Sequence, residues 1–125
     1  MNDINKVLVT GFLTAKPELR YTPTGIKMVN LRLAIHRKYK NKNQEVKDET
    51  EFITAVAWND IAEHCVKYLQ KGCRVFVDGR FYTREYLDKN QQKHYVVEIR
   101  IESIEFLGKF EKNQETTENP KEEVK

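Results

Sequence analysis

The sequence predicts a mainly β fold, a small barrel of four or five strands with one α-helix inserted after the third strand. Short runs of alternating or β-branched residues are separated by turn residues, and a single segment shows the spacing of an amphipathic helix. The 125 residues suffice for one domain with a modest core. An open α+β sheet with the helix on one face is the alternative, because periodicity does not separate the two.

The first half of the chain supplies two strands. Residues 5–13 (NKVLVTGFL) are rich in β-branched and apolar residues. A loop that contains Pro17, Pro23 and Gly25 follows, and residues 27–39 then alternate between apolar and polar side chains. Residues 40–49 (KNKNQEVKDE) are polar and charged, which predicts a hairpin or a loop.

The third strand, in the stretch TEFITAVAW (50–58), has two different faces. One face carries Phe52 and Trp58, and the other carries Ile53, Ala55 and Ala57. A small barrel has a narrow interior, which favours the smaller residues inside and turns the two aromatic rings outward. The competing interpretation packs the rings beneath the helix.

The helix is predicted over residues 60–72 (DIAEHCVKYLQKG). Asp60 and Glu63 have the spacing of a capping box, and Gly72 is suited to end the helix in the left-handed conformation. The apolar positions follow i, i+4, i+5 and i+8 and form one stripe: Ile61, Cys65, Val66 and Leu69.

The last two strands are predicted at residues 74–87 and 94–107, joined by a turn within 88–93. Gly79 indicates a bend or bulge in the first of them. Residues 109–125 contain one aromatic and one aliphatic side chain, which is typical of a disordered tail. The predicted domains are therefore a folded unit, residues 1–108, and a polar tail, residues 109–125.

The charge favours an anionic partner. The whole chain carries a net charge of +3, and residues 109–125 carry four Lys against five Glu, so residues 1–108 carry +4. No apolar run is long enough to cross a bilayer, and the first residues do not resemble a signal or transit peptide. These features predict a cytoplasmic protein that does not contact membranes.

The sequence contains few of the motifs that are typical of enzymes or metal-binding proteins. The five glycines are isolated, so no phosphate-binding loop is predicted, and no Ser or Cys lies in a nucleophile elbow. The Cys and His residues lack metal-ligand spacing, and Cys65 and Cys73 are interpreted as reduced core residues. We expect neither an enzyme nor a cofactor or metal site.

A binding surface is indicated by GRFYTREY (79–86). Alternation places Arg80, Tyr82, Arg84 and Tyr86 on one face of the strand. Aromatic faces stack on unpaired bases, and neighbouring cations follow the phosphates. The alternative is an outer sheet face on which Arg stacks on Tyr for modest stability.

Longer motifs resemble a known family. NKVLVTGFL, KPELRYTPTG, NLRLAIHRKY, KDETEFITAVAWNDIAEHCVKYLQKG, VFVDGRFYTREY and YVVEI occur in that order. Together they resemble the bacterial single-stranded DNA-binding proteins across about residues 3–107. The resemblance implies a five-stranded oligonucleotide/oligosaccharide-binding (OB) barrel, with its helix between the third and fourth strands. It also implies a homotetramer that binds single-stranded DNA without sequence preference or catalysis.

The resemblance also assigns roles to residues. It implies that Tyr39, Phe52, Trp58 and Tyr86 stack on bases, and that Lys6, Arg20, Lys47 and Arg84 contact phosphates, in addition to the pattern-derived Arg80. The expected function is to coat and protect single-stranded DNA during replication, recombination or repair, in the cytoplasm and associated with the nucleoid. The alternatives are an RNA-binding or primosome-type OB module, and a protein-interaction module that uses the same face.

Two further expectations concern partners. The resemblance implies subunit contacts near Asn5–Val9 and around Tyr82, so Tyr82 belongs either to that interface or to the DNA face. The sequence ends in ENPKEEVK and lacks the acidic Pro-Phe tip with which family members recruit replication and repair enzymes. Weak or absent recruitment of such enzymes through the tail is therefore expected.

Overall fold

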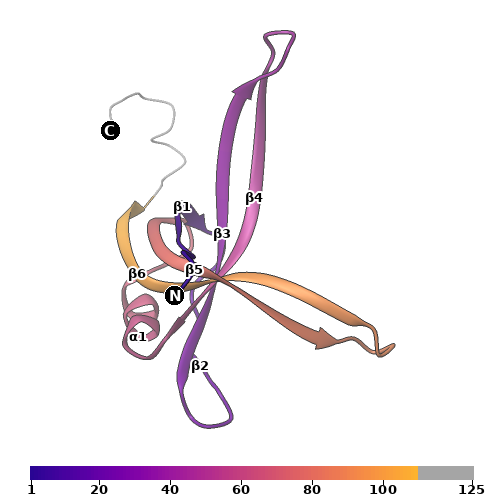
Figure 1. Ribbon diagram of the computed structural model, residues 1–125. Coiled ribbons are helices and arrows are strands. Elements are labelled where there is room, and N and C mark those ends of the chain that lie inside the picture. The colour runs from indigo at the N-terminus through magenta and orange to yellow at the C-terminus, as the bar shows by residue number, and fades with distance from the viewer. Residues whose placement is uncertain (110–125) are drawn as a thin grey trace.

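Six strands and one helix make up residues 1–109, the part of the chain that the computed structural model describes (Figure 1). In chain order they are β1 (Val7–Leu13), β2 (Arg20–Tyr21), β3 (Lys27–Lys40), β4 (Val46–Trp58), α1 (Asn59–Tyr68), β5 (Cys73–Leu87) and β6 (Lys93–Lys109). The predicted tail, residues 109–125, lies outside this part except for its first residue.

The strands form one sheet that closes on itself. Their order is β1-β5-β6-β4-β3-β2, and an additional pairing joins β1 to β3. β4 and β6 run parallel, and the other pairs are antiparallel. Because β1 pairs with both β5 and β3, the five long strands make a closed barrel, with α1 between the third and the fourth of them. The predicted fold class is confirmed, and the open sheet is excluded.

Two hairpins extend far beyond the barrel (Figure 1). We call residues 36–50 the β3–β4 arm and residues 82–98 the β5–β6 arm. The segment 40–49, predicted as a hairpin or loop, forms a hairpin: residues 41–45 make the turn, closed by the Asn41 N–H that donates to the Glu45 carbonyl at 3.0 Å, and residue 40 and residues 46–49 belong to the two strands. Strand pairing continues into this polar segment because a hairpin ladder needs backbone partners and no apolar face.

The helix is shorter than the sequence predicts, and it begins differently. It ends at Tyr68, and its N-cap is Trp58, whose side chain makes no capping hydrogen bond, so the predicted capping box of Asp60 is wrong. Gly72 has a φ of 90°, as expected of a left-handed residue, but it lies in the turn after the helix. There its N–H donates to the Leu13 carbonyl at 2.9 Å and ties the turn to β1.

The barrel interior contains the small face of β4. Ala55 and Ala57 are fully buried and Ile53 packs against the same core. The two cysteines, Cys65 and Cys73, are buried and free, as predicted. Burial raises the pKa of the Cys65 thiol to about 11, so this thiol is protonated at neutral pH. Within residues 1–109, no helix is long and apolar enough to cross a membrane.

Gly79 lies at a close approach of β5 to β6. The strand register shifts between Asp78 and Gly79, which confirms the predicted bulge. A Cβ atom at Gly79 would lie 2.2 Å from the Arg100 carbonyl oxygen and 2.9 Å from Cγ2 of Ile99. The absence of a side chain at position 79 therefore allows the close approach from which the β5–β6 arm leaves the barrel.

Candidate nucleic-acid interface

The outer face of β4 presents the two predicted aromatic rings. Ala55 and Ala57 fill the interior, so Phe52 and Trp58 point away from it. Phe52 lies opposite Ala34 of β3, and its side chain remains 52% exposed beside this small neighbour. Trp58 is partly buried. The prediction that the small face is buried is confirmed, and neither ring is sealed in the core.

The other two predicted stacking residues lie on the arms. Tyr86 pairs with His94 near the end of the β5–β6 arm. Tyr39 pairs directly with Lys47 on the β3–β4 arm. Successive side chains of a strand point to opposite faces, and an odd number of positions separates Tyr39 from Ala34 on β3. The same holds for Lys47 and Phe52 on β4. The Tyr39–Lys47 pair therefore lies on the opposite face of the hairpin from the Ala34–Phe52 pair. The four rings therefore follow the two arms and the barrel surface between them, and do not share one face.

Each predicted ring has a cationic or imidazole neighbour. The guanidinium carbon of Arg32 lies 5.4 Å from the centre of the Phe52 ring, and that of Arg37 lies 4.7 Å from the Tyr39 ring. The Tyr86 and His94 rings are stacked, with centroids 5.1 Å apart and an angle of 18° between their planes. Arg100 lies over Trp58 at 5.5 Å. Such contacts hold the rings in place, and the three arginines set positive charge beside Phe52, Tyr39 and Trp58.

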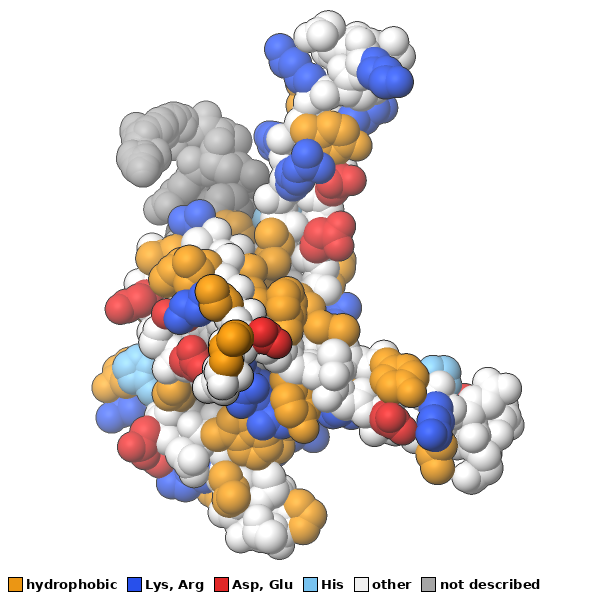
Figure 2. All heavy atoms as spheres, viewed as in Figure 1, with side chains coloured by type: hydrophobic (Ala, Val, Ile, Leu, Met, Phe, Trp, Pro, Cys, Tyr) orange, Lys and Arg blue, Asp and Glu red, His pale blue; other side chains and the backbone are white. Residues whose placement is uncertain are grey.

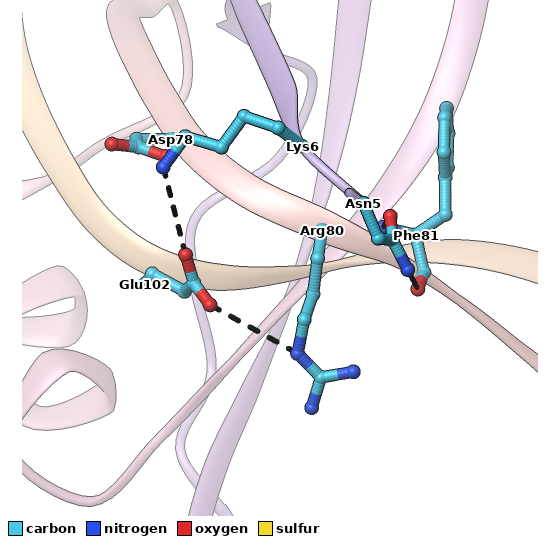
Figure 3. A network of polar contacts seen from close by, with 6 residues as sticks. All are labelled: Asn5, Lys6, Asp78, Arg80, Phe81 and Glu102. Carbon is cyan, nitrogen blue, oxygen red and sulfur yellow. Dashed lines mark hydrogen bonds and ion pairs between the residues drawn. The ribbon is translucent and has the colours of Figure 1, made fainter. Parts of the chain in front are cut away.

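Every predicted phosphate-binding side chain also has an acidic neighbour. Lys6 Nζ lies 2.5 Å from Asp78 and 3.7 Å from Glu102, and Arg80 Nε lies 3.9 Å from Glu102 (Figure 3). The pKa of Lys6 is raised, first by its hydrogen bond to Asp78. The remaining pairs are Arg84–Glu98 at 3.3 Å, Arg20–Glu18 at 3.8 Å and Lys47–Glu45 at 3.9 Å.

These ion pairs influence how an anion would bind. Apart from Glu98, which is almost fully buried, the carboxylates are partly or fully exposed. Exposed pairs contribute little to stability and are screened by salt, so a phosphate can compete for the cation. Arg84 is different, because its movement to a phosphate would leave the buried carboxylate of Glu98 without a partner. Of the five, Arg84 is the least available to a phosphate.

Sequence reasoning missed Arg32 and Arg100. Arg32 donates to the Thr54 hydroxyl at 3.4 Å and covers Phe52, while Arg100 lies between Trp58 and Tyr82. Alternation along each strand places both arginines on the outer face. Their aromatic neighbours, however, belong to other strands. Figure 2 shows Lys and Arg side chains along the β3–β4 arm and beside hydrophobic side chains at the root of the β5–β6 arm.

The turn of the β5–β6 arm holds the Tyr86–His94 stack in place. His94 Nε2 lies 2.7 Å from Asp88 Oδ2, and the other carboxylate oxygen accepts the backbone N–H groups of Asn90 and Gln92 at 2.8 and 2.9 Å. These contacts lower the pKa of Asp88, the His94 bond most of all. The ionised carboxylate thus organises the turn and fixes the imidazole that stacks on Tyr86.

Acidification is expected to loosen this turn. The folded pKa of Asp88 lies below the unfolded value of about 3.9. Its contribution to stability is therefore complete above that unfolded value and is lost as the pH falls through the lowered folded value. NMR titration of the Asn90 and Gln92 amides should show a transition below pH ~4 that is absent in Asp88→Asn. Amide shifts that do not change over this range would contradict the assignment.

Within residues 1–109, no group of three or more His, Cys, Asp or Glu side chains is arranged to hold a metal ion. The outer face and the arms instead offer aromatic rings, guanidinium groups and ammonium groups. This combination suits a flexible polyanion that carries flat, unpaired rings.

Comparison with known sequences gives a consistent result. A profile of the single-strand binding protein family matches residues 4–107. The chain is 41% identical over 104 residues to the single-stranded DNA-binding protein of Halalkalibacterium halodurans, covering 83% of this chain and 61% of that protein. It is 40% identical over 104 residues to single-stranded DNA-binding protein A of Bacillus subtilis, covering 83% and 59%. The matched part thus spans about 60% of the length of these two relatives.

Two solved structures with similar folds carry the same kind of name, single-stranded DNA-binding protein or its abbreviation SSB. One is the "Plasmodium falciparum SSB complex with ssDNA", with a TM-score of 0.79 and 27% identity, covering 86% of this chain and 97% of that one. The other is a deletion mutant of the single-stranded DNA-binding protein from Thermus aquaticus, with a TM-score of 0.74 and 30% identity, covering 83% and 50%.

Proposed function

Because the chain belongs to the single-strand binding protein family, a family of DNA-binding proteins and not of enzymes, we propose that it coats single-stranded DNA without sequence preference. Coating would keep the strand unpaired and protected during replication, recombination or repair, in the cytoplasm and at the nucleoid. Bases stack on Phe52, Trp58, Tyr39 and Tyr86, while lysines and arginines contact the phosphates.

The observation that carries this mechanism is the paired arrangement of rings and cations on the outer face. Phe52 is half exposed although it is a large apolar residue, and Arg32 lies over its ring. A ring held in this way has a face for a base, and its neighbouring charge lies within reach of the adjoining phosphate. The two arms extend the same combination beyond the barrel.

We also propose that four copies of the chain assemble around this function. Ile4 and Leu8, beside and within β1, are 95% and 58% exposed, and exposed apolar side chains of this kind are favoured at subunit contacts. Asn5 fixes this segment through hydrogen bonds with the Phe81 backbone at 3.0 and 2.9 Å. Light scattering should give the mass of four chains, and a monomer mass would contradict the assembly.

The intrinsic fluorescence of Trp58, the only Trp in the chain, provides the test of function. Titration with poly-dT should quench it strongly, duplex DNA should quench it little, and binding should weaken as salt rises. Absent quenching by poly-dT, together with absent binding, would exclude the function. Equal or stronger binding of RNA would favour an RNA-binding or primosome-type module. Failure to bind any oligonucleotide would favour a protein-interaction module.

A further inference from the structure

Arg100 lies where β6 is flanked by β4 and β5. It lies on β6 and pairs with Val56 of β4 on one side and with Arg80 of β5 on the other. Its guanidinium carbon lies 3.5 Å from the centre of the Tyr82 ring and 5.5 Å from that of Trp58. The guanidinium is therefore held between two aromatic side chains, one from each neighbouring strand.

Arg100 differs from three nearby cations in its partners. Arg80 has Glu102, Arg84 has Glu98 and Lys6 has Asp78, whereas Arg100 makes only ring contacts among residues 1–109. Its positive charge also lies directly opposite that of Arg80, an unfavourable cross-strand pair. The guanidinium therefore lies against two rings and forms no ion pair with a carboxylate among residues 1–109.

Two N–H groups in this cluster are also left without acceptors. Nε of Arg100 and Nε1 of Trp58 are buried and have no hydrogen-bond partner within residues 1–109. Buried donors normally find an acceptor, so a site that holds two of them beside an unpaired charge is incomplete in the isolated chain. An oxyanion would supply both the acceptor atoms and the negative charge.

We propose that Arg100 is the principal phosphate-binding residue of this interface and takes one backbone phosphate of single-stranded DNA. The inference rests on the proposed function and assigns the phosphate contact to a residue that the sequence patterns did not indicate. Arginine is suited to this role because its planar guanidinium binds two phosphate oxygens at once while its face stays on Tyr82. The bases on either side of that phosphate then lie near Trp58 and Tyr82.

The test uses Arg100→Met and, as its comparison, Arg80→Met. Methionine keeps apolar volume between Trp58 and Tyr82 but removes the charge. The slope of log K against log salt for oligo-dT should become shallower by about 0.7 in Arg100→Met, the value of one phosphate contact on single strands. The change in Arg80→Met should be smaller, because Glu102 already neutralises Arg80. The melting temperature of Arg100→Met should not fall, because an unbalanced charge beside Arg80 is removed.

The variant Arg100→Lys separates charge from shape. It should keep the salt slope but bind less tightly, since an ammonium cannot stack on Tyr82 and hold two oxygens together. An unchanged slope in Arg100→Met, a slope change in Arg80→Met as large or larger, or an altered oligomeric mass would overturn the inference. A sharp fall in melting temperature would do so as well, because Arg100 would then be holding the rings for stability. Wild-type protein that does not bind oligo-dT would instead refute the proposed function.

Discussion

Phe52→Ala is expected to weaken the binding of single-stranded DNA by about 1–3 kcal/mol, about 5- to 150-fold in affinity, and to leave the fold intact. The ring is half exposed and lies opposite Ala34, so its removal leaves no large cavity. What disappears is the face on which a base stacks and the ring over which Arg32 lies. Fluorescence anisotropy with labelled oligo-dT measures the change.

Tyr68→Ala is the matched control. Tyr68 lies on α1, is 54% exposed and has Lys67 over its ring at 5.3 Å, against 52% and 5.4 Å for Phe52 and Arg32. The two substitutions therefore remove rings of similar exposure with similar cationic neighbours, one from the barrel and one from the helix. Equal losses of affinity in both would show that the effect does not depend on the outer face of β4.

Trp58→Ala should weaken binding by a similar amount, with an added cost in stability. The indole is partly buried at the start of α1, so its removal also takes away packing. Trp58→Phe separates the two effects, because it retains a ring at the start of the helix. We expect intermediate affinity and nearly unchanged melting for Trp58→Phe. Melting that falls sharply in both variants, with affinity per folded molecule unchanged, would make this ring a core residue.

Gly79→Ala is expected to destabilise the protein by about 1–3 kcal/mol. The new methyl would meet the Arg100 carbonyl oxygen at 2.2 Å, and this oxygen belongs to the backbone and cannot rotate away. Either β5 or β6 must move, at the bulge from which the β5–β6 arm leaves the barrel. In a domain of this size, thermal melting should fall by roughly 4–8 °C per kcal/mol.

Gly11→Ala serves for comparison. Its nearest contact, the Ala34 carbonyl oxygen at 2.9 Å, overlaps less, so a smaller loss of stability is expected. Gly79→Ala should also reduce DNA affinity, because moving β6 at Arg100 displaces the guanidinium from Trp58 and Tyr82. If Gly79→Ala melted at the wild-type temperature, β5 and β6 could move apart at the bulge without loss of stability. That result would contradict the closed barrel.

The helix shows which features local sequence patterns predict and which they do not. The apolar stripe correctly predicts a helix in this region, and Cys65 and Leu69 of that stripe are buried. The capping pattern at Asp60 and the ending at Gly72 are wrong: the N-cap is Trp58, which still pairs with Met28 of β3, and the helix ends at Tyr68. Gly72 is bound to Leu13 of β1, a partner that no local rule can supply.

Some properties of the candidate binding residues also follow from local patterns, and others depend on strand register. Alternation alone turns Phe52 and Trp58 outward, and the structure confirms it. The position of Tyr39 relative to these two rings depends on strand register, which places Tyr39 on the reverse side of its arm. Arg32 and Arg100 could not be matched to their rings from sequence, because each lies on a different strand from the ring that it covers.

By itself, the sequence determined which side chains point into the barrel, where the helix lies and which rings face outward. Each of these follows from the period of a strand or helix, a property of neighbouring residues. Only the tertiary structure decided which cation meets a carboxylate and which meets a ring. Those contacts depend on the register between strands that are distant in the chain, and the bulge at Gly79 shifts that register. Arg80 and Arg100 therefore differ in chemistry because one lies within reach of Glu102 and the other between two rings.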